Sequence, residues 1–218
     1  RLGFAPEDIP QLIERLKHQS AVMPRSVFSH LVGSDSTRFD EFTRSQIQVF
    51  EKASQELQDA FPHKILRHIC NTAGIERYTD AQYDMVRLGV GLYGVNPFTN
   101  EMLHNVSTLK TTILQIRDVP QEDSVGYSRK GRLMRDSRIA AIPIGYADGL
   151  NRHLGNGKGY CIVNGKKAPY VGNICMDVCM IDVTDIDCKE GDKVIVFGDE
   201  LPVTVLADIL DTIPYEIL

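Results

Sequence analysis

Polar residues that could hold an anion follow three apolar, strand-like runs in the first half of the sequence. They are Ser29-His30, Asn71-Thr72, and Arg87 with Gly89. A threonine hydroxyl can donate to a phosphate oxygen, and glycine lets main-chain N–H groups approach an anion closely. A guanidinium carries donors only and could face a ring nitrogen or a carboxylate. Each feature alone more often reflects capping, turn or strand-bending chemistry, so only their combination suggests a binding site.

Two tyrosines in the second half lie in glycine-flanked segments. Tyr127 lies within Ser124–Ser128, and Tyr146 follows Gly145 at the end of an apolar run. Tyrosines in such places usually pack against their neighbours. A phenol is a poor base at neutral pH unless nearby cations favour its ionised form. A catalytic role for either tyrosine would therefore require positive charge close by.

The elements that must position these residues change in character along the chain. In the first half, apolar periodicity predicts helices over 6–19, 39–57 and 76–84, strands over 26–29, 65–70 and 85–90, and a loop at 71–74. After about residue 105, alternation predicts strands over 111–116, 138–144, 160–163, 176–183 and 193–197, with a type I′ turn at Asn164-Gly165. An α/β part is therefore expected to precede a mainly β part.

The first part is too short for a complete (β/α)8 barrel, which needs ~250 residues. The sequence has 218 residues, opens on Arg1 without a methionine and ends on an apolar Ile217-Leu218 pair. We expect residues 1–105 to be the C-terminal part of such a barrel and residues 106–218 to be a mainly β domain. The chain is expected to be truncated at both ends, with the missing barrel units before Arg1.

Composition excludes several classes of function. The chain has 24 Lys+Arg against 29 Asp+Glu, a net charge of −5, so a nucleic-acid partner is not expected. No apolar run is long enough to span a membrane and no signal segment opens the chain, which favours the cytoplasm. The five cysteines lack ligand spacing, so we expect reduced thiols and no metal site. They are Cys70, Cys161, Cys175, Cys179 and Cys188.

Three segments together carry a family resemblance. They are Met85–Gly94 (MVRLGVGLYG), Ile142–Gly149 (IPIGYADG) and Val171–Asp177 (VGNICMD). From Arg1 to Tyr215, in order and spacing, the chain resembles the alanine racemases, which interconvert L- and D-alanine with pyridoxal 5′-phosphate (PLP) and supply D-alanine for bacterial peptidoglycan. The resemblance implies a PLP-binding (β/α)8 barrel, a mainly β C-terminal domain, and a homodimer whose active sites take residues from both subunits.

The resemblance also implies roles for individual residues. Tyr127 would be one of the two bases, with Arg1 supplying positive charge and His30 holding the tyrosine. Arg87 would face the pyridine nitrogen of PLP. Met176 would offer its backbone N–H to the substrate carboxylate, and Tyr146 would narrow the entrance. The other cofactor-binding residues implied are Asn71, Thr72, Gly89, Val90 and Tyr215.

The sequence departs from the family pattern at several points. Asn173 stands where arginine is expected, Ser128 where glycine is common, and Thr72 where serine is common. The family lysine that binds PLP would precede Arg1, so this chain alone is expected to be inactive. Two alternatives remain open: a catalytically silent dimerisation or binding module of a larger polypeptide, and another PLP-dependent amino-acid racemase or decarboxylase of the same fold, including one acting on serine.

Overall fold

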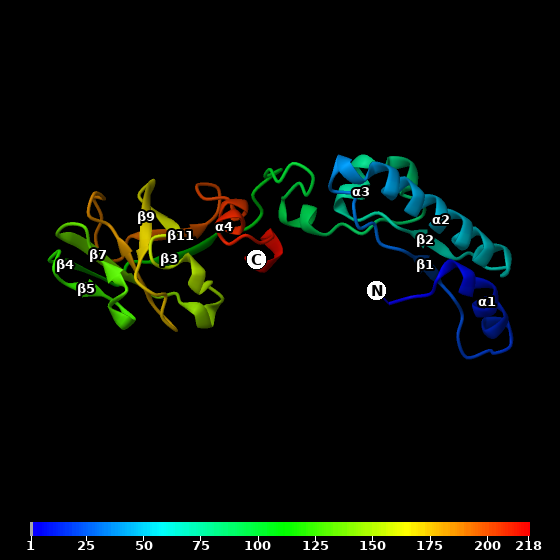
Figure 1. Ribbon diagram of the computed structural model, residues 1–218, viewed down its shortest axis with the longest axis horizontal. Helices are drawn as coiled ribbons and strands as arrows, with labels where there is room; N and C mark the ends of the chain where they lie inside the picture. Colours follow the sequence, from blue (N-terminus) through cyan, green and yellow to red (C-terminus); the bar gives the residue numbers. More distant parts are fainter. Residues whose placement is uncertain (1) are drawn as a thin grey trace. The chain divides into compact units, whose positions relative to one another are not determined.

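The computed structural model describes residues 2–218, which form two compact units (Figure 1). The first unit extends to Leu92 and takes in Asn96–Glu101. The second comprises Tyr93–Val95 and Met102–Leu218. Each unit has its own buried apolar core.

The first unit is built on two parallel strands, β1 (Ser26–Phe28) and β2 (Leu66–His68), with Val27 opposite Arg67. Parallel neighbours need a long crossover, which the helix α2 (Asp40–Asp59) provides. The other elements are η1 (Pro6–Asp8), α1 (Ile9–Lys17), η2 (Thr37–Phe39), α3 (Thr72–Arg77), η3 (Thr79–Ala81) and η4 (Val90–Tyr93), which ends in the second unit.

Helical spacing of apolar residues explains how α1 and α2 pack. Ile9 and Ile13 of α1 are buried with Leu57 of α2, while Ile47 and Phe50 of α2 pack in a second cluster. These positions recur at intervals of three, four or seven residues, which places them on one face of a helix. The predicted helices over 6–19 and 39–57 are therefore confirmed, with α1 preceded by a short 3-10 turn at Pro6–Asp8.

Three predictions in this unit are wrong. The expected loop at 71–74 is the start of α3, because the Asn71 side chain caps the helix by accepting from Gly74 N at 3.0 Å. The expected helix over 76–84 ends at Arg77 and is followed by η3. Within residues 2–218, the expected strand over 85–90 makes a single backbone hydrogen bond to the segment that follows β2, from Arg87 N to Cys70 O, and so forms no ladder.

The second unit contains a seven-stranded antiparallel sheet in the order β3-β11-β8-β9-β10-β7-β4. Its strands are β3 (Leu109–Thr112), β4 (Gln115–Val119), β7 (Ser137–Ile142), β8 (Tyr160–Val163), β9 (Lys166–Val171), β10 (Cys179–Asp182) and β11 (Lys193–Phe197). A separate hairpin joins β5 (Ser124–Val125) and β6 (Gly131–Arg132). The remaining elements are η5 (Tyr127–Arg129), η6 (Tyr146–Asp148), η7 (Arg152–Leu154), α4 (Val203–Ile209) and η8 (Pro214–Glu216).

Most of the strands expected in this half are confirmed. Strands over 160–163 and 193–197 have the predicted bounds, and Asn164-Gly165 joins β8 to β9 with both φ values positive, at 48° and 74°, as a type I′ turn requires. The single strand expected over 111–116 is wrong. The chain breaks at Ile113-Leu114 because β3 and β4 pair at opposite edges of the sheet, with β11 and β7.

A large apolar cluster fills the core of the second unit. It includes Tyr170 and Ile181 and three thiols, Cys161, Cys179 and Cys188. Burial raises the pKa of the Cys179 thiol to about 12, and all five cysteines are free, as the sequence predicted. Within residues 2–218, no helix combines the length and the apolar character that crossing a membrane requires.

Candidate active site

The Arg87 side chain forms hydrogen bonds next to the C-terminal ends of both parallel strands of the first unit. Its guanidinium donates to the carbonyl of Ser29 at 2.7 Å, just after β1. It also donates to the carbonyls of His68 and Ile69, both at 3.3 Å, where β2 ends. The side chain is therefore fixed at the carboxyl edge of the sheet, where α/β proteins place their binding sites.

Two histidines complete the surroundings of this guanidinium. His68 Nδ1 lies 2.6 Å and His30 Nδ1 lies 3.2 Å from Arg87 nitrogens. Because a guanidinium only donates, both imidazole nitrogens accept. Burial first, and then the charge of Arg87, lower the pKa of His68, which favours the neutral ring that this geometry needs. Burial likewise lowers the pKa of Arg87.

His68 was missed by the sequence analysis. The available signal was its position, since it ends β2 much as His30 follows β1. Phe28 stacks on its ring with centroids 5.2 Å apart. Within residues 2–218, no carboxylate lies within 4.0 Å of the Arg87 guanidinium. Among the described residues, the positive charge of Arg87 is thus surrounded by neutral acceptors and has no carboxylate partner.

Thr72 and two glycines form a small polar cradle in the same unit. Thr72 Oγ1 accepts from Gly89 N at 2.9 Å and from Gly91 N at 3.3 Å. With both lone pairs used, the hydroxyl proton is directed away from these amides as a donor. A Cβ on Gly91 would lie 2.6 Å from Thr72 Cγ2, so the close approach requires glycine there. Gly91 was not among the predicted site residues.

The neighbouring predicted residues take different places. The Asn71 side chain is engaged by the start of α3: its Oδ1 accepts from Ser34 Oγ at 2.8 Å as well as from Gly74 N, and its Nδ2 donates to Leu31 O. Val90 begins η4 and is buried. Arg1 lies outside the described residues. The first unit therefore brings together Arg87 and His30 at the strand ends, and Thr72 and Gly89 in the cradle.

In the second unit, the segments Ile142–Gly149 and Val171–Asp177 are joined by backbone hydrogen bonds. Tyr146 N donates to Cys175 O and Ala147 N donates to Met176 O, both at 3.0 Å. A Cβ on Gly145 would lie 2.2 Å from Met176 O, so only glycine permits this approach. Within residues 2–218 the Met176 N–H makes no hydrogen bond. Tyr146 and a free Met176 donor are thus held side by side.

The remaining predicted tyrosines are both accessible. Tyr127, in η5, exposes 72% of its surface, and its backbone follows Gly126, which has a φ of 77°. Tyr215, in η8, meets the edge of the Tyr93 ring at a centroid distance of 6.1 Å. Burial first, and then Tyr93, raise the pKa of Tyr215.

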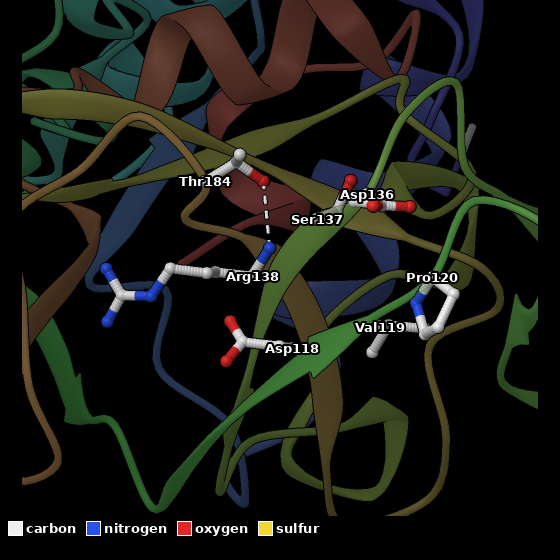
Figure 2. A pocket seen from close by; sticks show the side chains of 7 residues that line it. All are labelled: Asp118, Val119, Pro120, Asp136, Ser137, Arg138 and Thr184. Atoms are coloured by element: carbon white, nitrogen blue, oxygen red, sulfur yellow. Dashed lines mark hydrogen bonds between the residues drawn. The ribbon is translucent and has the colours of Figure 1, made fainter.

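A cavity of about 290 Å³ lies elsewhere in the second unit (Figure 2). Asp118 and Arg138, opposite each other on β4 and β7, line it together with Thr184. The Arg138 side chain donates to the carbonyls of Ile186 and Cys188. None of the predicted site residues lines this cavity. The part of the chain that the structure describes contains no cluster of three potential metal-ligating residues.

Comparison with known proteins places these features in context. Residues 1–97 match the family model described as "Alanine racemase, N-terminal domain", and residues 106–218 match "Alanine racemase, C-terminal domain". Alanine racemase 1 of Clostridium acetobutylicum is 37% identical over all of this chain and 59% of its own length. The alanine racemase of Aeromonas hydrophila is 38% identical, with 61% of its length covered.

Solved structures agree with the sequence matches. The alanine racemase of Bartonella henselae, with covalently bound pyridoxal phosphate, has a TM-score of 0.85 and 31% identity over 100% of this chain and 60% of its own. The alanine racemase of Clostridium difficile in complex with cycloserine has a TM-score of 0.88 and 32% identity over 99% and 59%. The predicted fold class is thus confirmed. The chain spans about 60% of the length of the relatives it matches.

Proposed function

Because the chain belongs to the alanine racemase family, we propose that it is part of a PLP-dependent alanine racemase that supplies D-alanine for bacterial peptidoglycan. The observation that carries the proposal is Arg87, whose guanidinium is held by neutral imidazoles and strand-end carbonyls at the carboxyl edge of β1 and β2. A donor-only group without a carboxylate partner in the described chain suits the unprotonated nitrogen of a pyridine ring.

The donor set of the first unit fits PLP. Arg87 would hold the ring nitrogen, and Thr72 would donate its hydroxyl proton to the phosphate while Gly89 orients that hydroxyl. We assign Val90 and Tyr215 to the same phosphate, and Asn71 to the support of Thr72 through the capped start of α3. PLP, when bound, supplies an electron sink for the carbon that loses its proton.

Racemisation removes a proton from one face of Cα and returns one to the other, so it needs two bases on opposite sides. We propose Tyr127 as one of them, because it is exposed in a glycine-flanked loop. Arg1 would favour its ionised form, and His30, already beside Arg87, would help to orient it. The second base would be a lysine from the part of the family length that this chain does not span.

Ile142–Gly149 and Val171–Asp177, the two segments joined by backbone hydrogen bonds in the second unit, would select the substrate. The free Met176 N–H would bind the substrate carboxylate. Tyr146, fixed to Cys175 through its backbone and partly covered by Arg152 at 5.7 Å from its ring, would narrow the entrance against larger side chains. These contacts favour a small amino acid, and we propose alanine.

The organisation of the whole protein is proposed on the same basis. Residues 1–105 would belong to the PLP-binding barrel and residues 106–218 to the mainly β domain. We propose a cytoplasmic homodimer in which Tyr127 serves the site of the partner subunit, with no nucleic-acid or membrane partner. The five free thiols are consistent with a reducing compartment.

The test uses a polypeptide that carries this chain together with the N-terminal part of the family length. With PLP, it should convert L-alanine to D-alanine, measured by chiral chromatography. Replacing Tyr127 by Phe should lower kcat roughly 10²–10⁴-fold. Tyr160→Phe, in β8, is the matched control and should leave the rate unchanged. Retention of the normal rate by Tyr127→Phe would reject the assigned base, and conversion of serine but not alanine would reject the substrate.

A further inference from the structure

The loop that presents Tyr127 has an unusual backbone. Gly126, Ser128 and Arg129 all have positive φ values, of 77°, 59° and 52°. Glycine adopts this conformation freely, whereas serine and arginine rarely do. Two consecutive residues in this region persist only where surrounding contacts impose it. Contacts to this segment must therefore hold the backbone around the tyrosine.

A chain of two side-chain amides supplies such a contact. Asn173 Nδ2 donates to the backbone carbonyl of Tyr127 at 3.3 Å, and Asn156 Nδ2 donates to Asn173 Oδ1 at 3.0 Å. The direction of these two hydrogen bonds is fixed by the Tyr127 carbonyl, because a carbonyl can only accept. The NH2 group of Asn173 must therefore donate to the Tyr127 carbonyl, and its side-chain oxygen accepts from Asn156.

Asn156 and Gly172, the residue before Asn173, are themselves anchored. Asn156 N donates to Gly172 O at 2.8 Å. Gly172 approaches the β5–β6 hairpin so closely that a Cβ on it would lie 2.6 Å from Val125 O. The amide chain thus links the carbonyl of Tyr127 to backbone that is packed against the strand leading into the same loop.

We infer that Asn173, backed by Asn156, is a positioning residue that fixes the direction in which the Tyr127 phenol leaves the backbone. The inference rests on the proposed role of Tyr127 as a base. The phenol is exposed, and its hydroxyl makes no hydrogen bond within residues 2–218, so the backbone carries the orientation. The arginine expected at position 173 by resemblance could donate to Tyr127 but could not accept from Asn156, so the two asparagines are a matched pair.

The first test reads the loop directly by amide hydrogen exchange of the 218-residue chain. Asn173→Asp keeps the size and the acceptor but loses the donor to Tyr127. It should raise exchange at Arg129 and Lys130, whose amides donate to Gly126 O and Tyr127 O, by about tenfold, the effect of losing a hydrogen bond of ordinary strength. Asn156→Gly tolerates the left-handed backbone and should raise exchange roughly twofold to fivefold. Asn164→Gly makes the same chemical change in the β8–β9 turn and should leave this loop unaffected.

The second test measures racemisation by the complete polypeptide. Asn173→Asp should lower kcat roughly 10–100-fold with little change in KM, because a misplaced base slows the chemical step and leaves binding intact. Since the two enantiomers are equal in free energy, kcat/KM must fall equally in both directions. The α-deuterium isotope effect should rise only for the enantiomer whose proton Tyr127 removes.

The two tests separate the inference from the proposed function. Unchanged exchange at Arg129 and Lys130 in Asn173→Asp overturns the positioning role whatever the activity. Faster exchange with an unchanged kcat, in an enzyme that Tyr127→Phe inactivates, also overturns it. If Tyr127→Phe stays active, the assignment of the base fails, while the exchange result still decides whether Asn173 orders the loop.

Discussion

The two units of the chain differ in how completely they bury their apolar side chains. The second unit builds one continuous sheet around a cluster that includes Tyr170, Ile181 and Leu206, each no more than 1% exposed. In the part of the first unit that the structure describes, the two strands have three residues each and the apolar clusters around Ile47 and Ile13 are small, and Phe28 on β1 and Phe42 on α2 are more than half exposed.

The difference concerns how the proposed functional groups are held. In the second unit, backbone contacts between segments distant in sequence fix Tyr146 and Met176. In the first, side chains such as Arg87 and Thr72 are fixed by hydrogen bonds to backbone at the edge of a small core. Order in the second unit is therefore a property of its core, whereas order in the first depends on a few polar contacts.

The largest expected effect is that the two units differ in their resistance to proteolysis, because only the second should be stable on its own. Limited proteolysis of the whole chain should leave a resistant fragment close to residues 102–218, because that unit has its own sheet and core. The first unit should be cut early, since a two-stranded parallel sheet is rarely stable alone. Mass spectrometry of the fragments gives the answer. A resistant fragment covering residues 2–92 with a digested β half would invert the comparison.

A second prediction concerns the lock between Tyr146 and Met176. Gly145→Ala places a methyl group against the carbonyls of Cys175 and Met176 and should lower the free energy of unfolding by about 3 kcal/mol. Gly149→Ala, at a φ of 95° with open space around it, should cost about 1 kcal/mol. Urea unfolding of both variants measures the difference. Equal losses would show that the backbone approach does not stabilise the second unit.

The same contrast explains what could be predicted from sequence. Alternation and the Asn164-Gly165 turn predict the bounds of β8 and β11 to the residue, and β8 pairs with β9 directly across that turn. The break between β3 and β4 was not predictable, since it arises from pairing with partners far along the chain. In the first unit, Met85–Val90 reads as a strand by composition but lacks the partner that would make it one.

The candidate site was predicted by resemblance rather than by pattern. No periodicity marks Thr72 as a group that joins Gly89 and Gly91, or Asn173 as a contact of Tyr127. His68 was missed because an isolated histidine at a strand end carries no distinctive pattern. Such residues become visible only when tertiary structure brings distant segments together.

A third prediction tests the cradle of the first unit. Thr72→Val keeps the shape but removes the oxygen that accepts from Gly89 and Gly91, leaving two half-buried N–H groups without it. The free energy of unfolding of the first unit should fall by about 1–2 kcal/mol. Native-state hydrogen exchange of the two glycine amides reports this loss. Thr72→Ser is the matched control and should retain slow exchange. Slow exchange in the valine variant would mean that other groups hold these amides.

The smallest expected effect is a pH dependence confined to the first unit. Asp84 accepts from Lys64 Nζ at 2.7 Å and from Arg67 N at 2.8 Å, beside β2. The Lys64 contact first, and then the Arg67 amide, lower the pKa of Asp84 below its ordinary value of 3.8. A carboxyl whose pKa is lower in the folded state stabilises the fold above its unfolded pKa, and this contribution disappears as the pH falls through the folded pKa.

Asp84→Asn should therefore destabilise the first unit near neutral pH, by about 0.5 kcal/mol, since the Lys64 end of the pair is exposed. The difference from the unmodified chain should shrink below about pH 4 and vanish once Asp84 is protonated in both states. Hydrogen exchange of the Arg67 amide follows the first unit, and the β8 amides of the second serve as an internal reference. Asp80→Asn, which removes an ion pair with Arg44 exposed at both ends, is the control and should have a smaller effect. An Asp84→Asn difference that stays constant from neutral to acid pH would show that its charge does not stabilise the strand edge.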